Sequence, residues 1–173
     1  MRNVWQLLIP MSLLLTTPPP MAHANADHEA RTRAQYRLGD DADEEARRKA
    51  ADQHRADFST PQGALEAWRA AVIRGNRADF LECLTPALRA LKYPRGIEAR
   101  IKYVDSKKYQ YLLMYATLGE AEPDGDRAHI NVGVSFKRAS GSLRTQFLRF
   151  TLHRLDNKWR LGDLGRKVRR SKP

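Results

Sequence analysis

The sequence predicts an α+β domain in which helices come first and an antiparallel sheet follows. Between Thr60 and Pro86, apolar residues recur about every 3.6 positions, and residues that favour helix ends separate the runs. Between Ala128 and Leu164, apolar residues alternate with polar ones, as in strands buried on one face. Helices followed by an antiparallel meander make an α+β arrangement.

Capping residues place three helices at the start of the domain. Thr60 caps the first helix, Pro61 occupies its first position, and Gly75 ends it. Asn76 caps a second, shorter helix. Thr85 precedes a proline and opens a third helix in the same way as Thr60.

The segment between these helices and the sheet has a less regular pattern. Residues Gly96–Asp105 are predicted to form a fourth helix because Ile97, Ile101 and Val104 fall on one stripe. Residues Tyr109–Ala116 are a mixed apolar and aromatic run, which is compatible with entry into a strand.

Turn signals delimit the predicted strands. Pro123–Asp126 is a strong turn that would join the first two strands as a hairpin. A second turn follows at Ala139–Ser142, and Asp156-Asn157 makes the third. The predicted strands are residues 117–122, 128–136, 143–155 and 158–164.

The first 26 residues have the features of a secretory signal peptide. One positive charge at Arg2 precedes a short apolar run, Val4–Leu15, and two overlapping Ala-x-Ala sites follow. The run contains Pro10 and is shorter than the roughly 20 residues of a membrane-spanning helix. We therefore expect a periplasmic or secreted protein that is cleaved after Ala24 or Ala26.

Composition divides the rest of the chain into three parts. Residues 27–57 contain one Tyr and one Leu but no Val, Ile, Phe or Trp, which is too little apolar surface to offset the entropy of ordering. We expect a charged flexible linker or a transient helix there. The formal net charge is +11, and residues 166–173 hold five bases and no acid. The sequence thus predicts a folded domain at 58–165 and a basic tail at 166–173.

Four short segments carry a family resemblance. They are Thr60-Pro61, Arg74-Gly75-Asn76, Phe80-Leu81-x-x-Leu84-Thr85-Pro86, and a final hairpin ending Leu155-Asp-Asn-Lys-Trp-Arg-Leu161. Together they resemble the nuclear transport factor 2-like, or ketosteroid isomerase-like, superfamily. That resemblance implies a cone, in which helices pack in the hollow of a curved antiparallel sheet and leave a pocket. Residues 93–116 do not fit the pattern, and a cystatin-like domain without a pocket is the alternative.

The sequence offers few candidates for chemistry. Isomerase-like members of that superfamily use a cavity acid as a base, and Asp163 is the acid in phase with core positions Trp159 and Leu161. The sequence therefore assigns no catalytic residue, and Asp163 is the one acid that remains a candidate base. No histidines have the spacing of metal ligands and Cys83 is the single cysteine, so the sequence predicts no metal and no other cofactor.

Two groups of residues are candidates for recognition. A tyrosine-rich stretch would line the mouth of the cone and hold a small apolar ligand, although core packing also explains it. Its members are Tyr103, Tyr109, Tyr111 and Tyr115. The basic tail would contact an anionic membrane or polyanion, although a solubilising end is the alternative. Its cations are Arg166, Lys167, Arg169, Arg170 and Lys172.

These expectations favour an exported, non-enzymatic binding or interaction module. It would hold a small apolar ligand or contact an anionic envelope surface, and export argues against nucleic acid as a partner. The alternative is a cavity enzyme of the isomerase or dehydratase type. The sequence identifies neither the ligand nor a protein partner, and it leaves a homodimer open.

Overall fold

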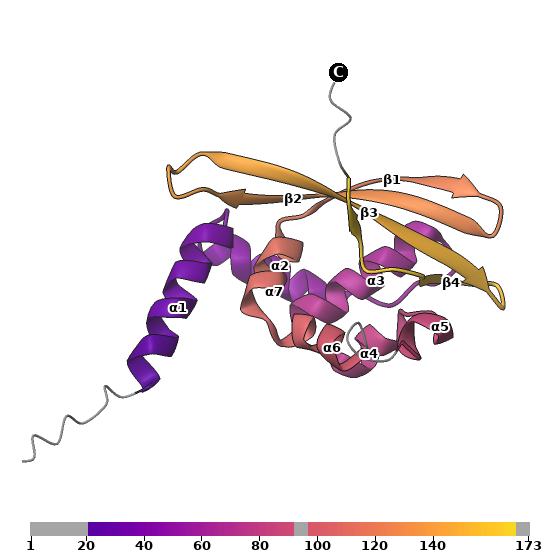
Figure 1. Ribbon diagram of the computed structural model, residues 1–173, viewed down its shortest axis with the longest axis horizontal. Helices are drawn as coiled ribbons and strands as arrows, with labels where there is room; N and C mark the ends of the chain where they lie inside the picture. Colours follow the sequence, from indigo (N-terminus) through magenta and orange to yellow (C-terminus); the bar gives the residue numbers. More distant parts are fainter. Residues whose placement is uncertain (1–20, 92–96, 169–173) are drawn as a thin grey trace, which may run out of the picture.

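The fold is α+β, as the sequence predicts. The structure is a computed structural model that describes residues 21–91 and 97–168. In these residues, helices precede a curved antiparallel sheet, and they lie against one face of it (Figure 1). The opposite face of the sheet carries no helix in the described part of the chain (Figure 1). The two faces therefore have different environments.

The first two predicted helices of the domain are confirmed with their caps. Helix α3 (Pro61–Arg74) begins where the Thr60 hydroxyl accepts a hydrogen bond from the Gly63 amide at 3.0 Å. It ends at Gly75, whose φ of 72° is the left-handed conformation that glycine adopts without strain. Asn76 then caps α4 (Arg77–Glu82). A short turn thus folds α4 back onto α3.

The next helices include one error of prediction. Helix α5 (Pro86–Arg89), capped by Thr85, and helix α6 (Ile97–Asp105) form as predicted. The expected entry into a strand at residues 109–116 is wrong, because α7 (Lys107–Met114) occupies this stretch. Aromatic content favours a strand, but packing against α3 decides the outcome, since α7 buries one face there.

The sheet is a meander with one addition. Strands β1 (Thr117–Asp124), β2 (Arg127–Lys137), β3 (Leu143–Leu155) and β4 (Lys158–Leu161) pair in chain order, so the predicted hairpins are confirmed. A fifth strand, β5 (Arg166–Lys167), pairs with β3 beside β4. The start of the predicted basic tail is therefore part of the sheet.

The core lies between the sheet and helices α3 and α7. Strands β2 and β3 bury alternate residues, among them Ile130, Val132, Phe150 and Leu152, and turn the intervening residues to the open face. A tight turn joins β3 to β4, and its two residues Asp156 and Asn157 both adopt positive φ, at 49° and 60°, as two-residue hairpin turns require.

Residues 27–57 are mostly helical, so the expectation of a flexible linker does not match the structure. Helix α1 (Met21–Tyr36) contacts α7 and β2, and helix α2 (Asp41–Gln53) contacts α3. The helix considered as the alternative around residues 43–51 corresponds to α2. The predicted cleavage sites at Ala24 and Ala26 fall within α1, whereas residues 1–20 lie outside the described residues. In the described chain, no helix is long and apolar enough to span a membrane.

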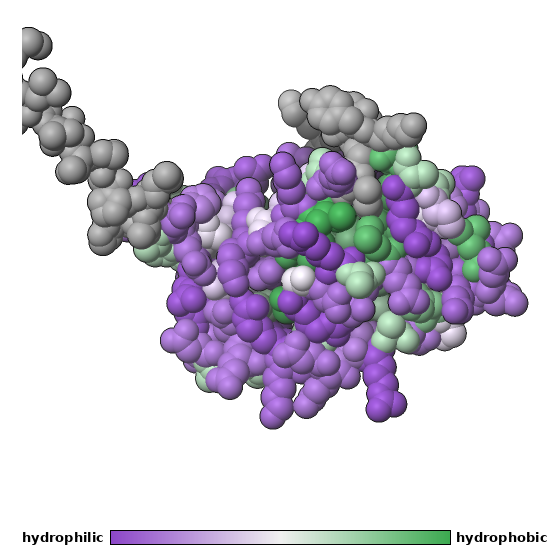
Figure 2. Space-filling view, turned by 90° about the horizontal axis from the view of Figure 1, so that it is seen from below, coloured by the Kyte–Doolittle hydropathy of each residue, from purple (hydrophilic) through white to green (hydrophobic). Residues whose placement is uncertain are grey.

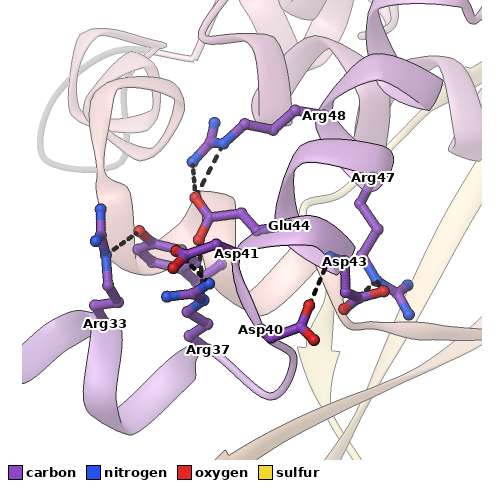
Figure 3. A network of polar contacts seen from close by, with 9 residues as sticks. Arg33, Arg37, Asp40, Asp41, Asp43, Glu44, Arg47 and Arg48 are labelled. Atoms are coloured by element: carbon purple, nitrogen blue, oxygen red, sulfur yellow. Dashed lines mark hydrogen bonds and ion pairs between the residues drawn. The ribbon is translucent and has the colours of Figure 1, made fainter.

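Charged groups add to the apolar contacts of Tyr36 and Ala51 in holding these two helices in place (Figure 3). Glu44 pairs with Arg37 at 3.2 Å and with Arg48 at 3.1 Å, and the side chains of Glu44 and Arg37 are only 12% and 13% exposed. Arg33 donates to the Tyr111 hydroxyl at 3.1 Å, which ties α1 to α7. A count of apolar residues could not reveal this network, and the linker expectation failed for that reason.

Candidate functional site

A cavity of about 360 Å³ lies between the helices and the inner face of the sheet. Its walls come from α1, α3, α4, α6, α7, β2, β3 and the loop after β4. Aromatic rings form much of the lining: Tyr36, Trp68, Phe80, Tyr103, Tyr109, Phe136 and Phe150. A small concave site lined by apolar and aromatic side chains is typical of ligand pockets.

The rings contact one another in pairs around the cavity. Trp68 lies 5.0 Å from Phe150 between ring centroids, and Tyr103 lies 4.4 Å from Tyr109. Both pairs are tilted, as aromatic rings prefer. The walls of the cavity are thus held by ring packing, which makes its shape largely preformed.

Lys108 is the charged side chain among the described residues that line this apolar site. The Lys108 ammonium lies 5.3 Å from the centroid of the Tyr36 ring. Close by on α7, burial raises the pKa of Tyr109, and Tyr103 raises it further. The Tyr109 hydroxyl therefore stays a neutral hydrogen-bond donor at neutral pH.

The four predicted tyrosines divide between two sides of the helical layer. Tyr103 and Tyr109 line the cavity. Tyr111 instead accepts a hydrogen bond from Arg33, and the Tyr115 ring lies 4.9 Å from the Arg47 guanidinium. Tyr111 and Tyr115 thus hold the N-terminal helices. They are four positions apart and share one side, whereas Tyr109 is two positions from Tyr111 and points to another.

Asp163, the acid singled out for catalysis, lies away from the cavity. Its Oδ1 accepts hydrogen bonds from the amides of Thr151 at 3.1 Å and Gly165 at 3.0 Å. The carboxylate thereby holds the loop after β4 against β3, which is a structural task. It lines a separate cleft on the open face of the sheet.

That cleft is basic and has a volume of about 430 Å³. Arg166, predicted in the tail, lies in it together with Arg127, Arg149, His129 and His153. Lys167 is exposed on β5 but does not line the cleft, while Arg169, Arg170 and Lys172 lie outside the described residues.

Sequence reasoning missed most of both sites, for different reasons. Trp68, Phe80 and Phe150 lie at apolar positions of the helical and strand patterns, but periodicity does not distinguish a packed core from one that encloses a cavity. For the cleft a signal was present: Arg127 and His129, like Arg149 and His153, are separated by even numbers of residues and so share a strand face.

The single cysteine has no chemical role that the structure supports. Burial raises the pKa of the Cys83 thiol to about 12, and its Sγ donates to the Asp79 carbonyl at 3.1 Å. A thiol in this state is a poor nucleophile. In the part of the chain that the structure describes, no group of His, Cys, Asp and Glu could hold a metal.

Comparison with known proteins bears on the fold alone. No protein family model and no curated protein matches the chain. Among solved structures, the fold is similar to the solution structure of a SEC-C motif containing protein from Rhodopseudomonas palustris. The TM-score is 0.51 and the sequence identity 13%, over 72% of this chain and 91% of the other.

This finding corrects the family resemblance drawn from the sequence. The similar structure belongs to a different fold family from the nuclear transport factor 2-like proteins, and a cone is not confirmed. The resemblance rested on caps, turns and core positions, such as Thr60-Pro61 and Asp156-Asn157, which serve any α+β domain with these helices and hairpins. Residues 93–116, which did not fit, contain α7 where a strand was expected.

Proposed function

We propose that the protein is a binding module whose cavity holds a small apolar or aromatic molecule. The aromatic lining of a cavity of about 360 Å³ carries this proposal. Ring faces from α3, α7 and β3 would contact such a ligand on several sides, and burial of apolar surface would supply the affinity.

The lining favours binding over catalysis. Its polar groups are tyrosine hydroxyls, Gln146 and Lys108, and none of the described lining residues is a carboxylate. A cavity isomerase or dehydratase needs a base within hydrogen-bond reach of the reacting atom, and Asp163 lies at the other face of the sheet. The enzyme alternative therefore has no observation in its favour.

Lys108, Tyr103 and Tyr109 suggest the chemistry of one end of the ligand. A carboxylate or sulfonate on the ligand would form an ion pair with the Lys108 ammonium, and the Tyr109 hydroxyl would donate a further hydrogen bond to it. We therefore propose an apolar ligand that carries one anionic group.

A fluorescent probe of this class tests the proposal. Anilinonaphthalene sulfonate combines aromatic rings with a sulfonate, and we expect it to bind with enhanced emission. Leu112→Trp, which adds bulk to the cavity wall, should weaken binding at least about tenfold by displacing the probe. Leu155→Trp adds the same bulk on the open face of β3 and should leave binding unchanged.

The two variants together decide the outcome. Equal binding by wild type, Leu112→Trp and Leu155→Trp would place the probe elsewhere and contradict the proposal. Thermal unfolding of each variant establishes that it is folded.

Lys108→Gln, at an exposed residue, gives a second test. Loss of the ammonium should lower the affinity for the sulfonate probe more than the affinity for an uncharged naphthalene.

The proposal places this module outside the cytoplasm. The support is the signal-peptide pattern of residues 1–26, with its short apolar run and Ala-x-Ala sites. N-terminal sequencing of the exported protein should begin at Asn25 or Asp27, and recovery of Met1 would contradict export.

A further inference from the structure

The basic cleft on the open face of the sheet is separate from the cavity. It is formed by β2, β3, β5 and the loop after β4, and it has a volume of about 430 Å³. In the β2–β3 register, Arg127 lies opposite His153 and His129 lies opposite Thr151. Arg149 lies opposite Arg166 across β3 and β5. Pairing of three strands thus brings three guanidinium groups to one concave surface.

The balance of charge in the cleft is positive. Among the described lining residues, three arginines face one acid, Asp163, before the imidazoles are counted. Two more acids lie at the β1 edge, where Glu122 pairs with Arg149 and Asp124 lies opposite Arg127 in the β1–β2 register. Asp163 is already engaged by two backbone amides and lies 3.9 Å from the Arg166 guanidinium. The Asp163 carboxylate is therefore largely satisfied by the loop amides, and it offsets only part of the positive charge of the arginines.

The arginines are available to a ligand. Arg149 pairs with Glu122 at 2.9 Å, but both side chains are about half exposed, at 47% and 55%. An exposed pair of this kind contributes little, so an anion of higher charge can compete for the guanidinium. Arg127 has no ion-pair partner in the described part of the chain.

Other features of the cleft suit an anion with several oxygens. The Thr151 hydroxyl and His129 Nδ1 lie 3.3 Å apart, which orients both groups toward the cleft that they line. Gly162 leaves room for the His153 ring, because any Cβ at this position would overlap the imidazole. The absence of a side chain at Gly162 thus allows His153 to pack into the cleft.

We propose that this cleft binds a phosphate group. Guanidinium groups match the geometry and charge of phosphate oxygens by donating paired hydrogen bonds, and Thr and His add single donors. The site lies on the opposite face of the sheet from the aromatic cavity and does not depend on the function proposed for it. The same chemistry recognises a phosphate group on a soluble compound and on a lipid headgroup.

An NMR titration with inorganic phosphate at fixed ionic strength tests the proposal. We expect saturable shifts of the His129 and His153 ring resonances. The double variant Arg127→Gln/Arg149→Gln should bind at least about tenfold more weakly, since it removes two charge-assisted donors. The control Arg138→Gln/Arg144→Gln removes the same charge near the other end of the β2–β3 hairpin and should bind within twofold of wild type.

A second arm distinguishes the source of the phosphate. Vesicles of phosphatidylcholine with and without phosphatidic acid are tested by co-sedimentation with the same variants. Binding of inorganic phosphate that depends on the site arginines supports a soluble ligand, and vesicle binding that depends on them supports a headgroup. Shifts that do not saturate, with no vesicle binding, overturn the proposal, as does equal loss in the control variant. Arg127→Gln alone, at an exposed residue, keeps the test valid if the double variant does not fold.

Discussion

Replacing Trp68 with alanine is expected to lower the free energy of unfolding by about 3–5 kcal/mol. Trp68 is 7% exposed and packs against Phe150 across the core, so the change removes a large buried ring and its partner contacts. Chemical denaturation with urea measures the loss as a lower midpoint at similar slope. Because Trp68 also forms part of the cavity wall, binding of the aromatic probe should weaken in parallel.

Two controls accompany this prediction. Trp68→Phe keeps an aromatic ring beside Phe150 and should cost less than the alanine variant. Leu143→Ala removes an apolar side chain that is 65% exposed, and its effect should stay within about 0.5 kcal/mol. A loss below about 1 kcal/mol for Trp68→Ala would mean that α3 does not present Trp68 to the core.

Gly165→Ala is expected to be the second most damaging change, for two separate reasons. Gly165 has a φ of 82°, which costs an L-residue about 1–2 kcal/mol. A Cβ at this position would also lie 2.8 Å from the Phe150 ring, and such overpacking adds about 1–3 kcal/mol. Urea denaturation should therefore show a total loss of about 2–5 kcal/mol.

Gly141 provides a matched control for the steric part of this effect. Its φ of 80° is nearly the same, but nothing lies within 4 Å of the position of a Cβ. Gly141→Ala should cost only the backbone contribution of about 1–2 kcal/mol. If the two alanine variants lose equal stability, the contact between residue 165 and Phe150 has no energetic weight.

Local sequence signals were sufficient for most of the fold. Caps at Thr60, Asn76 and Thr85 and the turn at Asp156-Asn157 act within a few residues, so the sequence alone locates them. Helix α7 and strand β5 depend on distant partners, α3 and β3, and no local pattern records such partners. For the same reason, charge pairing across helices placed α1 and α2 where composition indicated a linker.

The candidate sites were less predictable than the fold. Tyr103 and Tyr109 were found by composition, but Tyr36 and Phe136 came from segments without any binding signal. A cavity depends on what neighbouring side chains leave unfilled, which is a property of the packed structure. Arg166 was identified by charge, whereas its place in a cleft follows from strand pairing.

Strand β3 contributes to both sites, with Phe150 in the cavity wall and Arg149 and Thr151 in the cleft. A slip of one residue in its pairing would exchange the two sets, because neighbouring side chains in a strand point to opposite faces. Charged groups would then enter the core and apolar rings would face water. The turn at residues 138–142, where the Arg138 amide donates to the Ser142 carbonyl, sets the register of β3 against β2. It thus determines the identity of two binding surfaces that none of its residues lines.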